Sequence, residues 1–466
     1  MNQLDLYHAL PYPLKVVAAS ARGLQLRGWR YGAETERLVR EALARDGWSA
    51  AQWAAYQERR LATVLTIARH RVPAYRRLWR GRTGDPTRLR DWPLLDKDAL
   101  RADPESFLVE GLDRRRLYRE GTSGSSGTPL SLWFRRETVR FWYALVEARS
   151  RRWHGVNDRD RWAILGGQLV ARPGRARPPY WVWNAALRQL YLSAFHLGPR
   201  SADAYVAAMA DHGVRHLYGY TAALDTLARE IGDRSAARAL DLAVVITNAE
   251  PLLAHQRARI EEVFGAPVRE NYGMAELVAA ASECEEGRLH WWPEVGVAEV
   301  LDDDLQPVAP GEAGELIATG LLGDVQPLIR YRVGDRVTAA PPDTRCPCGR
   351  SLPILDRVEG RHEEAIATLD GRKVNRFDAV FKGRLPVREA QIEQVAADRV
   401  VVRLVIDEGY DARAAALVRA RMHDRIGRAM TVDLEPVERI ERGPNGKFQM
   451  VRGLRTDRPS ATEERE

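Results

Sequence analysis

The chain has 466 residues, of which 45% are hydrophobic and 29% charged, the composition of a soluble protein with room for two or three domains. Its longest apolar runs are far shorter than the ~20 residues that cross a bilayer, and the early residues lack the order of a signal peptide, so neither a membrane span nor secretion is expected. The net charge is +7, yet the 71 basic residues are interleaved with 64 acidic ones, which argues against a nucleic-acid binder, and an odd set of three cysteines predicts a cytoplasmic protein without a disulfide framework.

The first hundred residues are predicted to be mostly helical. Between residues 35 and 80, apolar side chains such as Trp53, Leu61 and Val64 recur at the spacing of one helix face, and Pro73 ends the run. Asp96 is expected to be the N-cap of a further helix, because its side chain can accept a hydrogen bond from a free backbone N–H group.

From about residue 160 to residue 335, short apolar runs alternate with helical patterns. This βαβα order predicts a sheet flanked by helices. Strands are expected at 162–165, 216–218 and 244–247, and helices at 201–212, 221–231 and 252–264. Within this region, residues 295–335 carry valine-rich strands broken by acidic and Pro-Gly turns, which predicts an antiparallel β subdomain.

A change of composition after residues 357–361 predicts a second domain. A hairpin at 365–372, a strand at 400–406 and a helix at 411–428 indicate a small α+β fold. The expected fold class is therefore α/β, with a large domain over residues 1–357 that combines helix-flanked sheets with a β subdomain. A small mobile α+β domain follows over 358–454, and a charged, frayed tail over 455–466.

The most informative stretch is Glu-Gly-Thr-Ser-Gly-Ser-Ser-Gly-Thr-Pro at residues 120–129. Its glycines let the backbone turn N–H groups toward an anion, and its hydroxyl groups add donors without bulk, which suits a phosphate. It is not a Walker A loop, because no Gly-Lys-Ser/Thr follows at the required spacing. The alternative interpretation is a flexible Gly/Ser linker.

Six further motifs follow this loop in order. They are Tyr218-Gly219-Tyr220, Ala249-Glu250-Pro251, Asn271-Tyr272-Gly273-Met274-Ala275-Glu276, Arg330 to Asp335, Arg357 to Arg361, and Gly443 to Phe448. Each has an ordinary reading by itself, such as a turn residue for Asp335 or a helix-start acid for Glu276. Together the seven motifs resemble the adenylate-forming enzymes, and among them the phenylacetate–CoA ligase-like group and its CapK-like branch.

This resemblance implies an ATP site. The β- and γ-phosphates would be held by the backbone of Thr122, Ser123, Gly124, Ser125, Ser126, Gly127 and Thr128. The adenine would be flanked by Ala249, Glu250, Pro251, Asn271, Tyr272, Gly273 and Met274, with Tyr272 stacking on it. Asp335 would accept hydrogen bonds from the ribose hydroxyls, and Arg357 would lie nearby.

The resemblance also implies the catalytic groups. Glu276 would ligate Mg²⁺, and Lys447, on the small domain, would reach the bridging oxygen and the incoming carboxylate. Glu363 falls where the family has its hinge. These roles make physical sense, because an acid oxygen that attacks an anionic α-phosphorus needs cations to offset the repulsion while pyrophosphate leaves.

Four residues are candidates for contact with the acid: Gly219 and Tyr220 in a matched motif, His196, and Ala275. The last of these departs from the family pattern. The family usually has Thr or Ser at this position, where the hydroxyl meets the carboxylate or the α-phosphate. Alanine removes that donor, which puts carboxylate handling and the strength of activity in question.

All three cysteines lie in two places, Cys284 with His290 six residues later, and Cys346 with Cys348. Three thiolates and one imidazole make a closed tetrahedral zinc set, which predicts a structural Zn²⁺ rather than a catalytic one. Members of the resembling group carry the same pattern at matching places. The alternative is that Cys284 is simply a buried thiol and His290 an ordinary surface residue.

The predicted function is ATP-dependent activation of a carboxylic acid, followed by acyl transfer to CoA or another thiol. An amide ligase with an amine acceptor is one alternative. A degenerate nucleotide-binding scaffold is a second, and a zinc-containing nucleic-acid binder is a third. The expected cofactors are ATP, Mg²⁺, structural Zn²⁺ and CoA, and the expected partners are small molecules, with room for a homodimer.

Overall fold

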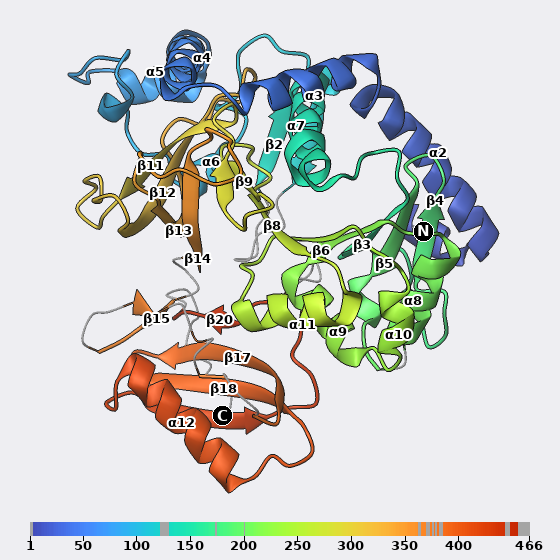
Figure 1. The fold of residues 1–466 in the computed structure, drawn as a ribbon. Coiled ribbons are helices and arrows are strands. Elements are labelled where there is room, and N and C mark those ends of the chain that lie inside the picture. The colour runs from blue at the N-terminus through green and yellow to red at the C-terminus, as the bar shows by residue number, and fades with distance from the viewer. Residues whose placement is uncertain are drawn as a thin grey trace, which may run out of the picture. The chain divides into compact units, whose positions relative to one another are not determined.

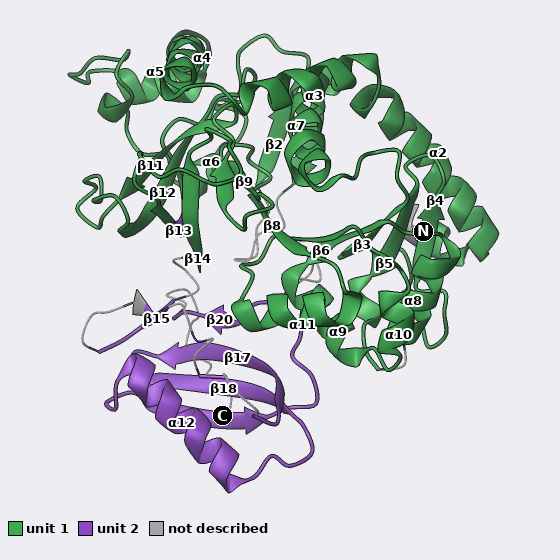
Figure 2. Cartoon of the chain, in the orientation of Figure 1, with its two compact units in different colours: residues 1–333, 337–358, 444–446 green, residues 334–336, 359–443, 447–466 purple. Residues whose placement is uncertain are grey.

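The computed structural model describes residues 3–121, 130–172, 175–199, 201–361, 365–369, 373–374, 377, 380–381, 385–442 and 448–454. The chain forms two compact units (Figure 2). The first comprises residues 1–333, 337–358 and 444–446, and the second comprises residues 334–336, 359–443 and 447–466. The predicted α/β fold, with a smaller α+β region at the C-terminal end, is confirmed.

One mixed sheet organises the large part of the fold (Figure 1). Its strand order is β11-β12-β13-β14-β10-β9-β8-β7-β6-β3-β5-β4. The strands β3, β5, β6, β7 and β8 pair in parallel, whereas β9, β10 and β4 join antiparallel to their neighbours. The bounds are β3 (Trp162–Gly166), β4 (Trp181–Asn184), β5 (Gln189–Ser193), β6 (His216–Tyr220), β7 (Val244–Asn248), β8 (Val268–Gly273), β9 (Ala280–Glu283), β10 (Leu289–Trp291), β11 (Gly296–Leu301), β12 (Ala313–Gly320), β13 (Tyr331–Ala339) and β14 (Ile354–Arg361).

The predicted antiparallel β region at 295–335 is present, but it does not form a sheet of its own. The strands β11, β12 and β13 continue the same sheet through β14 and β10. The connection exists because β10 pairs antiparallel with both β9 and β14, so a short strand joins the two halves. The sequence pattern of each strand could not reveal this pairing.

Four helices cover one face of the parallel strands: α8 (Ala202–Asp211), α9 (Thr221–Glu230), α10 (Arg234–Arg238) and α11 (Ala254–Phe264). Their apolar residues form one core with the strands; Leu165, Leu217 and Val245 pack there against Leu224 and Ile260. These spans confirm the predicted βαβα order. Burial of alternate strand residues on this face leaves the intervening residues, such as Tyr218, on the opposite face.

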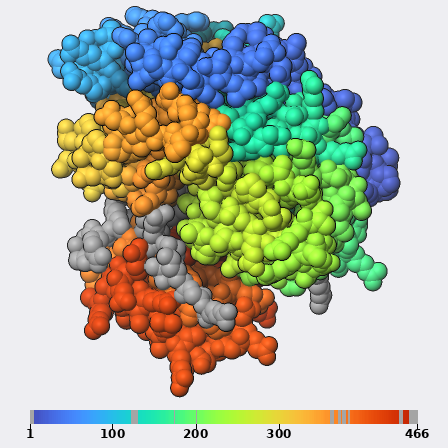
Figure 3. Space-filling model, in the orientation of Figure 1, coloured from blue at the N-terminus to red at the C-terminus, as the bar shows by residue number. Residues whose placement is uncertain are grey.

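The N-terminal region is helical, as predicted. Its helices begin at Gln3, well before residue 35, where the apolar spacing in the sequence begins. Its helices form a surface layer along one side of the first unit (Figure 3). They are α1 (Gln3–Ala9), α2 (Tyr12–Arg30), α3 (Ala33–Arg45), α4 (Ala50–Arg71) and α5 (Pro73–Trp79), and a further short helix, α6 (Lys97–Ala102), follows in the chain. Helix α2 lies against β4 at Gly23. The approach is so close that a Cβ at this position would be 2.1 Å from the Asn184 Oδ1 atom, so only glycine fits.

Asp96 occupies the N-cap position of α6, but its side chain makes no capping hydrogen bond. Instead one carboxylate oxygen lies 3.6 Å from Arg332 Nε. The predicted position is therefore right and the predicted bond is wrong, because a nearby cation attracts the carboxylate.

A π-helix, Glu147–Arg151, follows helix α7 (Arg136–Val146), and all five of its residues are buried. Such turns insert one extra residue into a helix and are frequent at functional sites. Among the described residues, no helix is both long enough and apolar enough to span a membrane.

The second unit has its own sheet, in the order β19-β18-β17-β20, with α12 (Ala412–Ile426) packed on it. The strands are β17 (Val387–Ala396), β18 (Arg399–Ile406), β19 (Thr431–Pro436) and β20 (Val451–Arg452). Val402 and Leu404 of the sheet share a core with Val418 and Met422 of the helix. A small hairpin, β15 (Ile366–Ala367) with β16 (Lys373–Val374), matches the predicted one.

Candidate active site

The carboxyl ends of neighbouring parallel strands bring several sequence motifs together. Across β6, β7 and β8, Tyr220 is paired with Asn248, and Asn248 with Asn271. Antiparallel pairing then sets Ser282 of β9 opposite Asn271, and His290 of β10 opposite Ser282. In open α/β sheets, ligands bind outside this edge of the parallel strands. We call this edge the carboxyl edge.

Gly219 and Tyr220 end strand β6 and lead directly into helix α9. A Cβ on Gly219 would lie 2.9 Å from the Leu165 carbonyl oxygen, so a side chain at this position would push β3 away. The Tyr220 ring is largely buried, and burial raises the pKa of its hydroxyl. The Tyr220 hydroxyl is therefore neutral. Tyr220 is paired with Asn248 on the neighbouring strand β7.

The Ala249-Glu250-Pro251 segment is fixed to the start of α9. One Glu250 carboxylate oxygen accepts a hydrogen bond of 2.7 Å from the Ala222 N–H group, and the Thr221 hydroxyl donates to the Glu250 carbonyl at 2.9 Å. The carboxylate thus satisfies a free donor in the first turn of α9. Ala249 has φ of +66°, an unusual value for a non-glycine residue, so these bonds hold a strained turn at the carboxyl edge.

The Asn271 carboxamide is bound from three sides. Its Nδ2 atom donates to the Tyr218 hydroxyl at 2.9 Å, and its Oδ1 atom accepts from the hydroxyls of Ser150, at 2.8 Å, and of Ser282. The two serine oxygens lie 3.1 Å apart. Burial raises the pKa of Tyr218, so its phenol group is neutral.

The segment after Asn271 places an aromatic ring and a carboxylate close to each other in the chain. Tyr272 meets Trp291 edge-on, with the ring centroids 6.1 Å apart. Met274 and Ala275 are partly buried against the adjoining core. The Tyr331 hydroxyl, on a fully buried residue, donates to Glu276 Oε1 at 2.9 Å and so orients this carboxylate.

The two arginines that flank Tyr331 are occupied by protein groups. Arg330 binds Glu299 at 3.0 Å, and Arg332 binds Glu315 at 2.6 Å. The Arg332 pair joins β13 to the adjacent strand β12, and the Arg330 pair ties the residue before β13 to β11, the strand beyond β12. Asp335, of the same motif, is a partly buried residue of β13, and Arg357 is an exposed residue of β14.

His196 lies just beyond the end of β5, and both of its ring nitrogens already have partners. Nδ1 is 2.9 Å from the Ser193 hydroxyl, and Nε2 is 3.0 Å from the Arg172 carbonyl oxygen. The ring stacks on Tyr180 at 4.7 Å between centroids. Burial lowers the pKa of His196, so a neutral imidazole is favoured.

Three of the sequence predictions lie outside the described residues: the Thr122 to Pro129 loop, Glu363 and Lys447. The flanks of the loop are described. Strand β1 (Tyr118–Gly121) pairs antiparallel with β2 (Ser131–Phe134), and Gly121 lies opposite Ser131. The loop therefore joins the two strands of a hairpin.

The three cysteines and His290 converge. The four potential ligand atoms all lie within 4.8 Å of one another. Cys284 Sγ is 3.6 Å from Cys346 Sγ, and Cys348 Sγ is 3.4 Å from His290 Nε2. Tetrahedral Zn²⁺ with Zn–S bonds of ~2.3 Å places two sulfur atoms ~3.8 Å apart, so the donor set fits that ion.

His290 is oriented for such a role. Its Nδ1 atom lies 3.1 Å from the Leu352 carbonyl oxygen, which leaves Nε2 to face the sulfur atoms. The residue is fully buried, so the alternative of a surface histidine is wrong. Burial raises the pKa of the Cys284 thiol to about 12 in the absence of a metal.

A buried ionic cluster lies beside these groups. Arg149, with no exposed surface, binds Asp46 at 3.0 Å and Glu294 at 2.8 Å. Burial disfavours the charge on Glu294, but the Arg149 guanidinium outweighs this and lowers the pKa of Glu294. The indole N–H of Trp153 donates to the second Asp46 oxygen at 2.8 Å. Trp153 also meets the His290 ring edge-on, at 6.0 Å between centroids.

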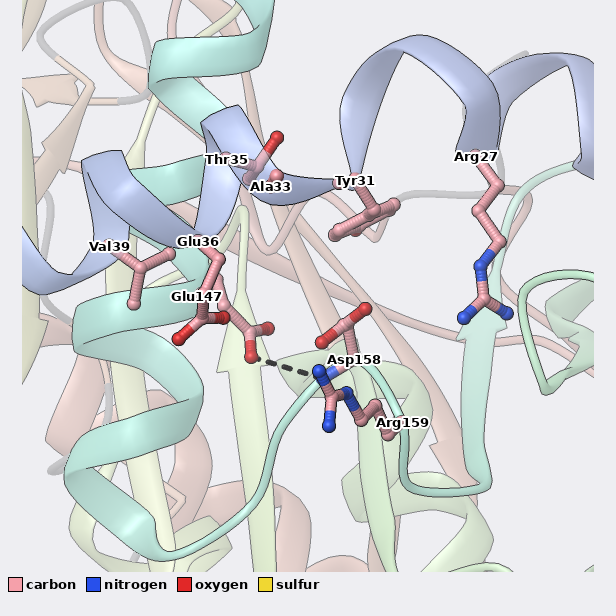
Figure 4. A pocket seen from close by; sticks show the side chains of 10 residues that line it. Arg27, Tyr31, Ala33, Thr35, Glu36, Val39, Glu147, Asp158 and Arg159 are labelled. Atoms are coloured by element: carbon pink, nitrogen blue, oxygen red, sulfur yellow. Dashed lines mark hydrogen bonds between the residues drawn. The ribbon is translucent and has the colours of Figure 1, made fainter.

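A separate hollow of about 310 Å³ lies between the α2–α3 turn and the π-helix (Figure 4). Its acidic groups are largely bound by neighbouring protein groups. Arg152 binds both Glu36 and Glu147, and the Asp158 N–H group donates to Glu147 at 3.0 Å. None of the motif residues lines this hollow.

The sequence reasoning missed several polar residues of the carboxyl edge: Ser150, Asn248 and Ser282. Tyr218 belongs to the Tyr218-Gly219-Tyr220 motif, but the sequence predicted no role for it. Asn248 directly precedes the Ala249 motif, and its Oδ1 atom is buried without a hydrogen-bond partner. That adjacency was the signal available for Asn248. No signal pointed to Ser150, which is 121 residues away from Asn271 in the chain.

Known proteins resemble the chain over most of its length. A family model described as an AMP-binding enzyme matches residues 178–322, and a model of the CapK C-terminal domain matches residues 366–453. Protein CapK of Staphylococcus aureus is 25% identical over 76% of this chain and 78% of that protein. A phenylacetate-coenzyme A ligase of Thermus thermophilus is 25% identical over 91% of this chain and 99% of that protein.

Solved structures share the fold. A 2-hydroxyisobutyryl-CoA ligase, in the postadenylation state in complex with R3-HIB-AMP, matches with a TM-score of 0.67 and covers 88% of this chain and 91% of that one. An open conformation of a 2-hydroxyisobutyryl-CoA ligase, in complex with 2-HIB-AMP and CoA, matches with a TM-score of 0.58. The sequence identities are 21% and 22%, so these likenesses concern the fold alone.

Proposed function

The chain belongs to the adenylate-forming superfamily, in its phenylacetate–CoA ligase-like and CapK-like branch, and from this premise we propose that it activates a carboxylic acid with ATP and transfers the acyl group to CoA. The observation that carries the proposal is the carboxyl edge, where Tyr220, Glu250 and Asn271 of three separate motifs lie on neighbouring strands or directly after them. Glu276 follows the same strand as Asn271.

The proposed reaction has two steps. First, a carboxylate oxygen attacks the α-phosphorus of ATP, the bond to the bridging oxygen breaks, and pyrophosphate leaves with its electron pair. Second, a thiol sulfur loses its proton and attacks the acyl carbonyl carbon, and AMP leaves. Both steps build negative charge on phosphate oxygens, so preorganised cations and N–H donors lower the barrier.

Each sequence motif is assigned a part in this scheme. The 122–128 loop would bind the β- and γ-phosphates, and Asp335 would bind the ribose, with Arg357 nearby. The residues Ala249 to Pro251 and Asn271 to Met274 would flank the adenine. Bound Mg²⁺ would neutralise phosphate charge, and Glu276 would hold it, since the Tyr331 hydroxyl already orients that carboxylate. Lys447 would act in adenylation, and the small domain would then rotate about Glu363 to present a second face for acyl transfer.

The acid is assigned to the end of β6 and its surroundings, with Gly219, Tyr220, His196 and Ala275 as contacts. The geometry of His196 favours a wall residue rather than a proton carrier, because Ser193 and Arg172 occupy its two nitrogens. Ala275 supplies no hydroxyl to the carboxylate. We therefore assign carboxylate binding to backbone donors and to Lys447.

The prediction that tests this function is ATP–pyrophosphate exchange across a panel of aliphatic and aromatic acids. Radiolabelled pyrophosphate is expected to enter ATP with at least one acid and not without acid, because acyl-adenylate formation is reversible. CoA should then convert the same acid to its thioester, identified by mass. An amide formed in preference from an added amine would instead establish the amine-acceptor alternative.

The absence of exchange with every acid, in protein that still binds ATP, would favour the degenerate scaffold. Ala275 is the feature that motivates that alternative. Its matched variant is Ala275→Thr, which restores the hydroxyl. Exchange that appears only in this variant would identify the alanine as the cause of the lost activity.

We also propose a structural Zn²⁺ at Cys284, His290, Cys346 and Cys348. Such an ion would join the β9–β10 hairpin to the 346–348 turn. Elemental analysis of the protein purified without chelator is expected to give close to one zinc per chain. The double variant Cys346→Ser/Cys348→Ser should lose the metal and unfold at lower temperature, because structural zinc contributes directly to folding. Metal-free wild-type protein of unchanged melting temperature would contradict this site.

A cytoplasmic location and a homodimer complete the proposal. The first is checked by fractionation of cells that express the tagged protein. The second is checked by sedimentation equilibrium of the purified chain. Neither of them bears on the chemistry at the carboxyl edge.

A further inference from the structure

We propose that Ser150 of the π-helix is a positioning residue for the nucleotide site. Ser150, Ser282 and Tyr218 together fix the Asn271 carboxamide. The fixed carboxamide in turn holds the backbone of residues 271–273, which would flank the base of ATP. The inference rests on the proposed function, since it assigns part of the same site. It concerns a residue far from Asn271 in sequence and outside every motif quoted above.

The carboxamide oxygen of Asn271 is fully used by the protein. A carboxamide oxygen has two lone pairs, and here two hydroxyls, those of Ser150 and Ser282, approach it. The amide nitrogen donates to the Tyr218 hydroxyl. The oxygen is therefore used by the protein and not by a ligand, so the task of this side chain is to hold its own strand.

The two serines are buried. Ser150 is 2% exposed and Ser282 is 1% exposed. Bulk water cannot take the place of a hydroxyl removed from such a buried site, so the carboxamide oxygen would lose a hydrogen-bond partner. Because Asn271 lies near the end of β8, a change in its side chain shifts the residues that follow, Tyr272 and Gly273.

The π-helix brings Ser150 to this position. Adjacent side chains of a regular helix point about 100° apart. In the π-helix, Arg149 is fixed to Asp46 and Glu294 on one side, while Ser150 meets Asn271. Arg151 is fixed to Glu147 within the same turn, at 3.2 Å. The buried ion pairs on both sides of Ser150 thus hold its hydroxyl against β8 and β9.

The experiment compares Ser150→Ala and Ser150→Cys with the wild-type full-length chain. Calorimetry measures the Kd for ATP, and pyrophosphate exchange measures the KM for ATP and for the acid. Both variants are expected to weaken ATP binding about tenfold, the scale for losing one of the two hydrogen bonds to a buried acceptor. The KM for the acid should change less than twofold. Alanine removes the donor and leaves space, whereas cysteine fills the space with a larger, weakly donating thiol, so a loss shared by both variants is due to the hydrogen bond rather than to packing.

Thr35→Ala is the matched control. The Thr35 hydroxyl is also buried and donates to the Arg30 carbonyl oxygen at 2.7 Å, but this bond lies at the start of α3 and contacts none of the motifs. It should leave the Kd for ATP unchanged. Tyr218→Phe should act in the same direction as Ser150→Ala, and the double variant should be less than additive, because both act through one carboxamide.

The outcomes separate the two proposals. Wild-type protein that neither binds ATP nor exchanges pyrophosphate with any acid overturns the proposed function and this inference together. Wild-type exchange with an unchanged Kd in both Ser150 variants overturns the positioning role alone. Equal losses toward ATP and acid, accompanied by a lowered melting temperature, indicate a merely structural serine and also overturn it.

Discussion

Replacement of Lys447 by alanine is expected to slow acyl-adenylate formation by ~10²–10³-fold, the scale for one preorganised charge-stabilising group. The physical reason is that the carboxylate and the α-phosphate are both anionic as they approach, and the lysine ammonium offsets this repulsion most strongly in the transition state, where the two groups are closest. Pyrophosphate exchange measures the step directly. The second step can be followed separately by supplying synthetic acyl-adenylate and CoA. It should be far less affected, because it has no pyrophosphate leaving group.

The control for this variant is Arg413→Ala, which removes one exposed cation from helix α12 of the same unit. It matches the loss of charge without touching a motif, and its exchange rate should equal that of the wild type. A Lys447→Ala enzyme with a wild-type exchange rate would remove the lysine from the mechanism. An equal loss in both half-reactions would instead assign it to binding of the AMP portion.

The second large effect concerns stability. Arg149→Ala is expected to destabilise the first unit by about 3–5 kcal/mol, because it leaves the buried Asp46 without a cation and Glu294 with Arg45 alone. Fluorescence in a urea titration measures the effect selectively. All 13 tryptophans lie before residue 293 and therefore in the first unit, so the signal reports on that unit alone.

Two variants sharpen this test. Arg37→Ala breaks exposed pairs with Glu34 and Glu41 and should change the stability far less than Arg149→Ala, because exposed ion pairs are screened by solvent. The double replacement of Arg149 and Asp46 by apolar residues of similar size should recover much of the loss, since it removes the unpaired Asp46 charge while Glu294 keeps its pair with Arg45. A loss of less than 1 kcal/mol for Arg149→Ala would show that the cluster is solvated.

Much of the local structure could be predicted from periodicity. The strands at 162–165, 216–218 and 244–247, and the helices between them, are governed by the alternation of apolar residues along short segments. Turn residues and composition likewise indicated the small α+β fold after residue 361. Helix α2 lies within the region predicted to be helical, but the recognised apolar spacing began only at residue 35, because the buried residues of α2 are Lys15 and Gly23 rather than a stripe of large apolar side chains.

The motifs of the candidate site were also readable, because the glycines, hydroxyls and carboxylates that suit a triphosphate are short and ordered in the chain. The sequence did not reveal which of these motif residues are bound by other groups of the protein. Arg330 and Arg332 belong to a matched motif but bind Glu299 and Glu315, and Glu250 binds the start of α9. Each of these partners is fixed by strand register or helix placement, which no single segment encodes.

The sequence by itself determined which residue types stand in the motifs and most of the strands and helices around the described ones, since residue type and local spacing carry that information. Only the tertiary structure decided that Asn248, Asn271, Ser282 and His290 form one row across β7 to β10. It alone brought Ser150 to that row and gathered Cys284, Cys346 and Cys348 around His290. The physical reason is that pairing between distant strands is selected by burial of the whole sheet and by the satisfaction of its hydrogen bonds, and both depend on the complete fold.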